Sequence, residues 1–274
     1  MKTALGLTMA VALASACPAM AAPKMVTGAV VYDLTLEDKG GMLSGVTGSM
    51  TAQMTRDCDT YWTESSLSAE FEGPTGAMTM EMSSVVSETA DSLGFDILGK
   101  FASIEVDRAE GTAIRTADGV SVALSEPETG THTVAGDVVF PLGMITGSIE
   151  AAKAGESLAS FVVYDGSGHG RDVWLVSVVI GAPMEPASDE DEEALFAAGL
   201  GFADMGRWQM VFSYFPRDAS GDQTPVFTSM AVVYENGFVQ AASYDFGEFA
   251  IRLTLEEFSP IPPTPCPYDR NPRR

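Results

Sequence analysis

Apolar and polar residues alternate over most of this chain from residue 30 onward. The segment Val30–Leu36 begins in this way, and Met78, Met80 and Met82 are separated by polar residues further on. Successive side chains of a β-strand point to opposite faces, so a period of two residues is typical of strands with one buried face. The pattern therefore predicts a mainly β protein.

Short turn sequences separate the alternating runs. Pro74-Thr75 lies between two glycines, Ala117-Asp118-Gly119 follows a strand-like run, and Asn236-Gly237 gives the strongest hairpin signal. These turns predict antiparallel hairpins joining about a dozen or more strands. An open sheet of that size tends to curl or split, so a sandwich, a closed barrel and a coiled continuous sheet all fit the pattern.

Two segments interrupt the strand pattern and predict one or two short helices. Residues 142–155 follow Pro141 and have the spacing of a short amphipathic helix. Residues 182–205 form an insertion, in which Ser188 can cap a helix that starts with the acidic run 189–193. That run lacks the ligand spacing of a calcium loop, which favours a solvated helix start. The role of the insertion stays open.

The first 21 residues have the pattern of a secretory signal peptide. Lys2 is followed by an apolar stretch at 4–14 that is too short to span a bilayer. Small residues precede Ala22, so we expect cleavage between Ala21 and Ala22. A core helix at the N-terminus is the alternative interpretation.

Lipidation at Cys17 is a second alternative to simple cleavage. A lipobox needs a larger aliphatic residue three positions earlier, where this chain has Ala14. We therefore expect a mature chain, residues 22–274, that forms a single periplasmic domain. No later stretch of sequence has the length and apolarity of a transmembrane helix.

The chain is strongly acidic, with 15 basic and 38 acidic residues and a formal net charge of −23. Binding to nucleic acid needs clustered lysine and arginine, so the composition excludes nucleic acid as a partner. Adsorption to an anionic membrane surface is disfavoured for the same reason.

Cys58 and Cys266 are the cysteines that remain after the predicted leader, and they lie near the two ends of the mature chain. An exported protein meets an oxidising compartment, so we predict a disulfide between them. Two unpaired buried thiols are the alternative. A metal site is disfavoured because His132 and His169 are far from both cysteines in sequence.

The sequence contains no catalytic constellation that we recognise. Of the two histidines, His169 lies in a glycine-rich turn and is expected to be exposed, and neither has a protease-like motif around it. Ser167 has adjacent glycines, but a nucleophile elbow needs them two positions away and a helix afterwards, where the sequence indicates a strand. We expect no catalytic, metal or cofactor-binding residues and no enzymatic activity.

Apolar side chains are more informative about function. The chain has 15 Met, 14 Phe and 7 Tyr. Methionine adapts to irregular apolar surfaces, so a curled sheet lined by such residues is suited to an acyl chain or an apolar peptide. Ordinary core packing is the simpler interpretation.

Several segments together resemble one known family. They are Val31-Tyr32-Asp33-Leu34-Thr35-Leu36, a strand with Gly48 that runs to Cys58, a strand with Trp62, Val163-Tyr164-Asp165-Gly166-Ser167, Val233-Tyr234-Glu235-Asn236-Gly237, Tyr244-Asp245-Phe246-Gly247-Glu248-Phe249 and Pro265-Cys266-Pro267. In this order they resemble the alphaproteobacterial cell-envelope integrity EipB family, over nearly the whole mature chain.

The resemblance implies a periplasmic β-spiral with a disulfide between Cys58 and Cys266, a role in maintaining the cell envelope, and no known enzymatic activity. The fold is similar to that of periplasmic lipoprotein carriers. Two functions follow as hypotheses. The first is a non-enzymatic protein that binds a partner protein or a lipid-type envelope component. The second is a lipid or lipoprotein carrier that holds acyl chains inside the curled sheet.

Overall fold

The computed structural model describes residues 24–38, 43–186, 200–218, 220–221 and 223–266. These residues form one fifteen-stranded sheet, two short α-helices and one turn of 3-10 helix. The prediction of a mainly β protein with a single curled, barrel-like sheet is confirmed.

Several sequence predictions fall outside the described residues. They concern the leader 1–21, the cleavage point between Ala21 and Ala22, Cys17, and the acidic run 189–193. Within the described part of the chain, no helix combines the length and apolarity needed to cross a membrane.

The strands follow the predicted alternating runs closely. They are β1 (Gly28–Asp38), β2 (Gly45–Asp57), β3 (Thr60–Gly73), β4 (Gly76–Glu88), β5 (Ser92–Phe101), β6 (Ile104–Thr116), β7 (Gly119–Glu126), β8 (Gly130–Ala135), β9 (Val138–Val139), β10 (Leu158–Val163), β11 (Trp174–Pro183), β12 (Arg207–Pro216), β13 (Phe227–Tyr234), β14 (Val239–Asp245) and β15 (Ala250–Pro260). The helices are α1 (Pro141–Lys153), α2 (Ser167–Gly170) and the 3-10 turn η1 (Phe202–Asp204).

Strand order in the sheet follows the chain, with one exception. Strands β1 to β8 are neighbours in sequence order, β9 to β15 are neighbours in sequence order, and β1 pairs with β15. The two ends of the chain are therefore joined in the middle of the sheet. Its two edges, β8 and β9, are consecutive in the sequence, so the opening of the curled sheet lies mid-chain.

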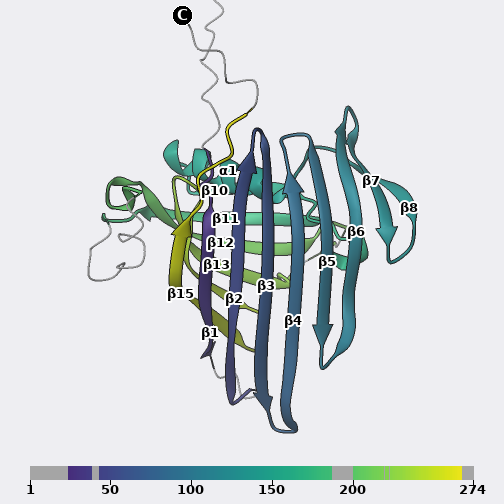
Figure 1. Cartoon of the computed structure of the whole chain (residues 1–274), viewed down its shortest axis with the longest axis vertical. Helices are drawn as coiled ribbons and strands as arrows, with labels where there is room; N and C mark the ends of the chain where they lie inside the picture. Colours follow the sequence, from purple (N-terminus) through teal and green to yellow (C-terminus); the bar gives the residue numbers. More distant parts are fainter. Residues whose placement is uncertain (1–23, 39–42, 187–199, 219, 222, 267–274) are drawn as a thin grey trace, which may run out of the picture.

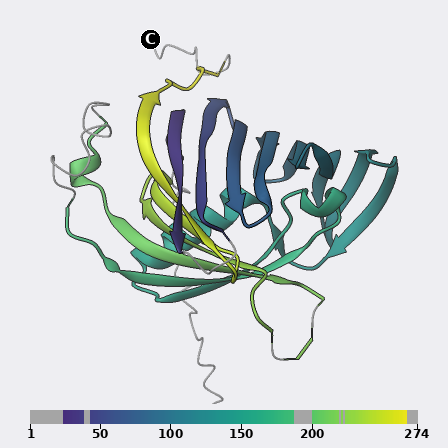
Figure 2. The same ribbon diagram turned by 90° about the horizontal axis from the view of Figure 1, so that it is seen from below.

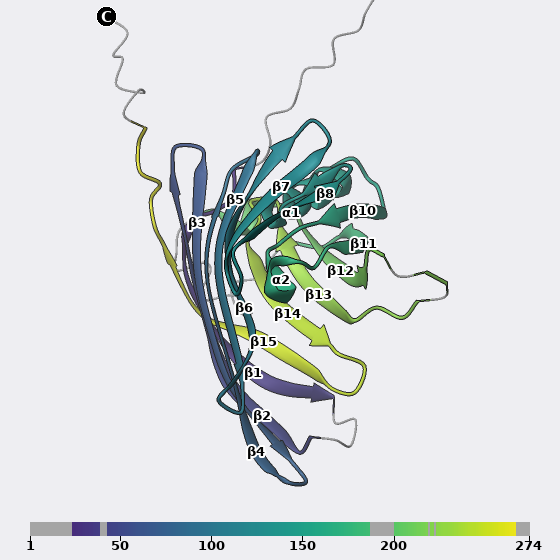
Figure 3. The same cartoon turned by 90° about the vertical axis from the view of Figure 1, so that its right-hand side faces the viewer.

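The sheet curls into two walls. Strands β1–β8 form the first wall and β9–β15 the second; in Figure 1 the strands of the first wall stand side by side, β15 stands beside β1, and β10–β13 cross behind. Seen from below, the walls curve around a shared interior (Figure 2). Figure 3 shows α1 and α2 between them, and the lower ends of β2 and β4 extend past the crossing strands.

One ladder departs from the antiparallel pattern that the hairpins predict. Strand β9 pairs with β10 in parallel, Val138 opposite Val162 and Val139 opposite Val163. Helix α1 lies between these two strands in the sequence, and a parallel pair needs such a crossover. The predicted helix at 142–155 is thus confirmed as α1, and its position explains the exception.

One local prediction was wrong: the segment directly after Gly166 is not a strand. The turn at Gly166 continues into α2 instead of entering a strand directly, since Gly166, Gly168 and Gly170 all adopt positive φ and coil the backbone.

Apolar side chains fill much of the space between the walls. The largest cluster joins both walls and includes Leu34 of β1, Ile180 of β11 and Met210 of β12. A second cluster, with Phe95, Phe140 and Tyr164, lies behind β5–β8, and a third forms around Phe202 of η1. Burial against both walls is what holds the curled sheet in one shape.

Cys58 and Cys266 form the predicted disulfide across 208 positions, with Cα atoms 5.0 Å apart. The C-terminal segment reaches it by crossing the end of β2, where the Thr264 N–H donates to the Arg56 carbonyl at 2.9 Å. The disulfide therefore fastens the tail to the joined centre of the sheet.

Candidate functional site

The concave side of the first wall is the surface that alternation makes apolar. Inward positions on β4 are Met78, Met80 and Met82, which pair with Phe71, Ala69 and Leu67 of β3. Met80 and Leu67 pack on the large core cluster, which fixes this face as the inner one. We call this surface the concave face.

One end of the concave face is filled. Phe95 of β5 lies between two glycines: a Cβ on Gly111 would come within 3.0 Å of its ring and a Cβ on Gly166 within 2.7 Å. The ring also meets the edge of Tyr164, whose hydroxyl donates to the Gly170 carbonyl at 2.9 Å. These contacts hold the α2 loop against the wall, and we call this region the closed end.

The other end of the concave face is open. Its apolar side chains keep large exposed fractions: Met82 44%, Phe101 36%, Ile104 68% and Val106 55%. Phe101 and Ile104 face each other across the β5–β6 hairpin, so they share the inner side of the wall. We call these four residues the open end. Contiguous exposed apolar side chains of this kind mark interaction surfaces.

Aromatic rings of the second wall continue this apolar surface. Tyr214 of β12 stacks on Phe227 of β13 at 4.2 Å between ring centroids, and Phe227 lies 6.1 Å from Phe246. Phe246 stacks on Phe249, whose ring meets Phe71 of the first wall at 5.7 Å. The interior is thus bordered by methionines on one wall and by aromatic rings on the other.

A buried carboxylate caps α1 from a distant strand. Phe140 at the N-cap provides no side-chain hydrogen bond, and the first turn contains no acidic residue. Glu88 of β4 accepts instead from the Leu142 N–H at 3.0 Å and the Gly143 N–H at 3.2 Å. Burial raises the pKa of Glu88 to about 7, against the lowering effect of those two donors.

A cavity of about 870 Å³ lies beside this cap and the disulfide. Met25, Tyr61, Phe161, Glu88, Arg56 and Arg115 are among its lining residues. Arg115 donates to the Val138 carbonyl at 2.8 Å and lies over the Phe140 ring, while Arg56 lies over Tyr61. The cavity therefore combines apolar walls with cations that are already held in place.

The two histidines have different neighbours. His169 is about half exposed, as expected, and its Nδ1 lies 3.5 Å from Asp107. His132 contacts the Tyr164 ring, and its Nε2 is buried with no hydrogen-bond partner in the described structure. Burial, and secondarily the charge of Arg171, lowers the pKa of His132.

Ser167 has partners other than histidine. Its hydroxyl donates to Asp165 at 2.7 Å and accepts from the Trp174 indole at 3.1 Å. Burial raises the pKa of Asp165, opposed by the hydrogen bonds from Ser167. This arrangement closes the turn before α2, and it orients the serine toward a carboxylate two residues earlier.

Among the described residues, no group of three or more His, Cys, Asp or Glu is placed to hold a metal ion.

Two features of this region were not deduced from the sequence. Glu88 continues the inward series of Met82, Ser84 and Val86, so the period of two would have indicated a buried acid. The open end has no such signal in the sequence. Alternation predicts that its side chains point to the inner face, but not whether another part of the chain covers them.

Comparison with known proteins agrees with this architecture. The family model described as EipB-like matches residues 19–262. The chain is 25% identical, over 248 residues, to the cell envelope integrity protein EipB of Brucella abortus (strain 2308), covering 88% of this chain and 86% of that protein.

A solved structure shares the fold. It is the crystal structure of a beta-barrel-like protein, from a domain of unknown function, of Brucella abortus. It superposes with a TM-score of 0.77 at 22% sequence identity, covering 88% of this chain and 100% of that one. The matched family model spans the strands, helices and concave face described above, and the chain belongs to the EipB-like family.

Proposed function

We propose that this protein maintains cell-envelope integrity from the periplasm by binding a partner protein or envelope component on its concave face, without enzymatic activity. The observation that carries the proposal is the open end, where Met82, Phe101, Ile104 and Val106 expose apolar surface beside an interior that apolar clusters largely fill. The side chains of such a surface are adaptable, so a partner can bind there with little conformational change in this protein.

The family membership and the disulfide support the same proposal. The Brucella abortus relative is named for cell envelope integrity. A disulfide that closes 208 positions fits an oxidising compartment outside the cytoplasm. Cleavage between Ala21 and Ala22 and the absence of lipid on Cys17 belong to the proposal and are checked by intact mass.

A paired set of substitutions tests the role of the open end. Ile104→Glu places a charge on the concave face, and Ile114→Glu places the same charge on the outer face of the same strand, where Ile114 is 55% exposed. In cells that lack the native protein, Ile104→Glu is expected to abolish envelope resistance to detergent, and Ile114→Glu to restore it fully. Equal restoration by both variants would overturn the proposal.

A second pair of variants separates binding from catalysis. His132→Gln and His169→Gln together are expected to leave detergent resistance intact, because neither histidine is joined to a nucleophile in the described structure. A folded double variant that alone loses function would reopen an enzymatic or metal role.

One observation favours a carrier function as the second candidate. The cavity of about 870 Å³ beside α1 has apolar walls formed by Met25, Phe140 and Phe161. It is of the size that small-molecule ligands occupy. Native mass spectrometry of protein exported to the periplasm distinguishes the two functions, since a retained acyl lipid adds mass that Gly147→Leu, which intrudes beside Phe161, would remove.

A further inference from the structure

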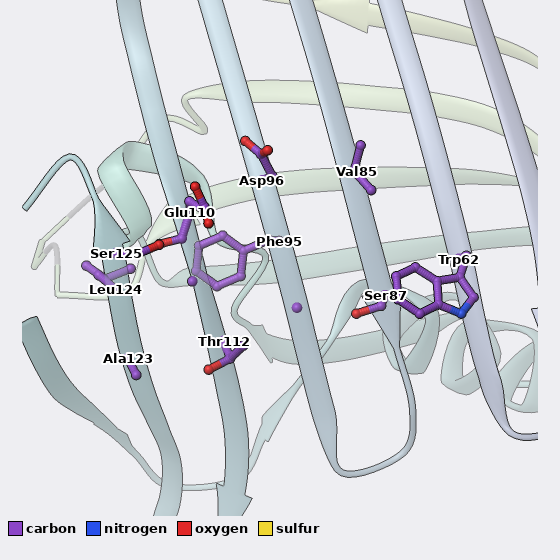
Figure 4. A pocket seen from close by; sticks show the side chains of 12 residues that line it. Trp62, Val85, Ser87, Phe95, Asp96, Glu110, Thr112, Ala123, Leu124 and Ser125 are labelled. Carbon is purple, nitrogen blue, oxygen red and sulfur yellow. The ribbon is translucent and has the colours of Figure 1, made fainter. Parts of the chain in front are cut away.

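A groove on the outer face of the first wall is separate from the concave face. It encloses about 450 Å³ and runs across β3 to β7 (Figure 4). The strand register aligns its floor in one row: Trp62, Ser87, Gly94, Thr112 and Ala123. Four strand spacings of about 4.8 Å make this row roughly 19 Å long.

Trp62 stands at one end of the groove. Its side chain is 47% exposed, whereas Trp208 is buried. Ser87 lies beside Trp62 in Figure 4, and Val85, two positions further along β4, is also exposed. A half-exposed indole offers a flat apolar surface beside a polar row.

Glycine keeps the centre of the groove empty. A Cβ on Gly94 would enter the groove and come within 2.6 Å of the Ser87 hydroxyl. Thr112 and Ala123 continue the floor with small side chains. The hollow is therefore a consequence of which residues occupy this row, and a larger residue at position 94 would fill it.

Charged and hydroxyl groups border the far side. Arg108 forms ion pairs with both Asp96 and Glu110, which line the groove. The Ser125 hydroxyl donates to the Glu110 carbonyl at 3.2 Å. The ion pairs with Arg108 orient both carboxylates, which are about half exposed and keep free acceptor capacity, and this lowers the entropic cost of binding.

We propose that this groove binds an uncharged oligosaccharide. A sugar ring has an apolar C–H face, which fits the Trp62 indole, and hydroxyl groups around its rim, which fit the hydroxyls of the row and the carboxylates of Asp96 and Glu110 on its far side. An extended groove of roughly 19 Å suits a linear chain of several rings and not a compact metabolite. The net charge of −23 disfavours anionic glycans.

Calorimetric titration of the full mature protein tests the proposal with three probes: chitotetraose, cellotetraose and maltotetraose. At least one is expected to bind with a Kd at or below about 1 mM. Trp62→Ala is expected to weaken that binding at least about tenfold, as loss of one aromatic contact implies. A blue shift of tryptophan emission on titration would locate the contact at the exposed indole.

Two further variants protect the test against misfolding. Gly94→Val fills the groove without removing Trp62 and is expected to weaken binding by a similar factor while the protein keeps its melting temperature within a few degrees. Ile114→Ala, on the same outer face but outside the groove, is the matched control and is expected to bind normally. Ile104→Glu should also bind normally, which separates this site from the concave face.

Co-sedimentation with purified peptidoglycan then distinguishes a polymeric glycan from a soluble one as the source of the sugar. The proposal is overturned if none of the three tetrasaccharides produces binding heat, if binding persists in a folded Trp62→Ala variant, or if an oligogalacturonate of equal length binds as tightly as the uncharged probes.

Discussion

Phe95 and Phe101 lie on the same strand and the same face, six positions apart, yet their surroundings differ completely. Phe95 is packed between Gly111 and Gly166 at the closed end and is 4% exposed, while Phe101 is 36% exposed at the open end. Alternation assigned both to the concave side. What separates them is the α2 loop: it packs on Phe95 through Gly166 and donates hydrogen bonds to Asp107 further along β6, whereas Phe101 keeps more than a third of its surface exposed.

The largest effect expected from this contrast is on stability. Phe95→Ala should lower the free energy of unfolding by about 3–5 kcal/mol, because it leaves a cavity between two backbones that cannot collapse. Phe101→Ala, the matched control, should cost less than about 1 kcal/mol. Urea unfolding of both variants measures the difference, and similar losses would show that the closed end is not tightly packed.

The disulfide is the next test, because it fastens the tail beside the closed end. Cys58→Ser should lower the free energy of unfolding by roughly 2–5 kcal/mol through the entropy of a loop of this length. Melting curves with and without reductant check this. Reductant should lower the melting temperature of the original protein and leave that of the variant unchanged. Identical curves for the original protein with and without reductant would show that the disulfide does not stabilise the fold.

Glu88 gives the closed end a pH dependence. Its pKa of about 7 in the folded protein exceeds the ordinary value of 4.5, so the folded state binds this proton more tightly. By linkage, the resulting stabilisation is complete below pH 4.5, decreases as pH rises toward 7 and is constant above that. The total change is on the order of 3 kcal/mol.

Glu88→Gln isolates this contribution. The amide oxygen still accepts from the Leu142 N–H, but it does not titrate. The variant should therefore gain stability relative to the original protein as pH rises from 4.5 to 7. Urea unfolding at several pH values measures this, and a constant difference across the range would contradict the assignment.

The smallest expected effect on stability is at the open end. Ile104→Glu should change the free energy of unfolding by no more than about 0.5 kcal/mol. It should nevertheless reduce binding of an apolar fluorescent dye by the native protein, whereas Ile114→Glu should not. If both variants reduce dye binding equally, the open end is no more accessible to apolar ligands than the outer face.

Features set by neighbouring residues were predictable from the sequence, and features that depend on contacts between distant residues were not. The Asn236-Gly237 turn and α1 followed from nearby residues, and Cys58 with Cys266 followed from elimination and resemblance. The pairing of β1 with β15 did not follow from local pattern, because no local signal specifies a partner more than 200 positions away. The same limit applies to Glu88, whose role requires knowing that α1 begins beside β4.

The pairing of β1 with β15 also sets an order in time. Synthesis begins at the N-terminus, so the first wall can form hairpin by hairpin while one side of β1 still has no neighbour. That side waits for the last strand of the chain, and Cys58 waits for Cys266. Until β15 pairs with β1, the first wall has an unpaired strand edge. The chain is therefore most exposed to aggregation in the period before that pairing forms.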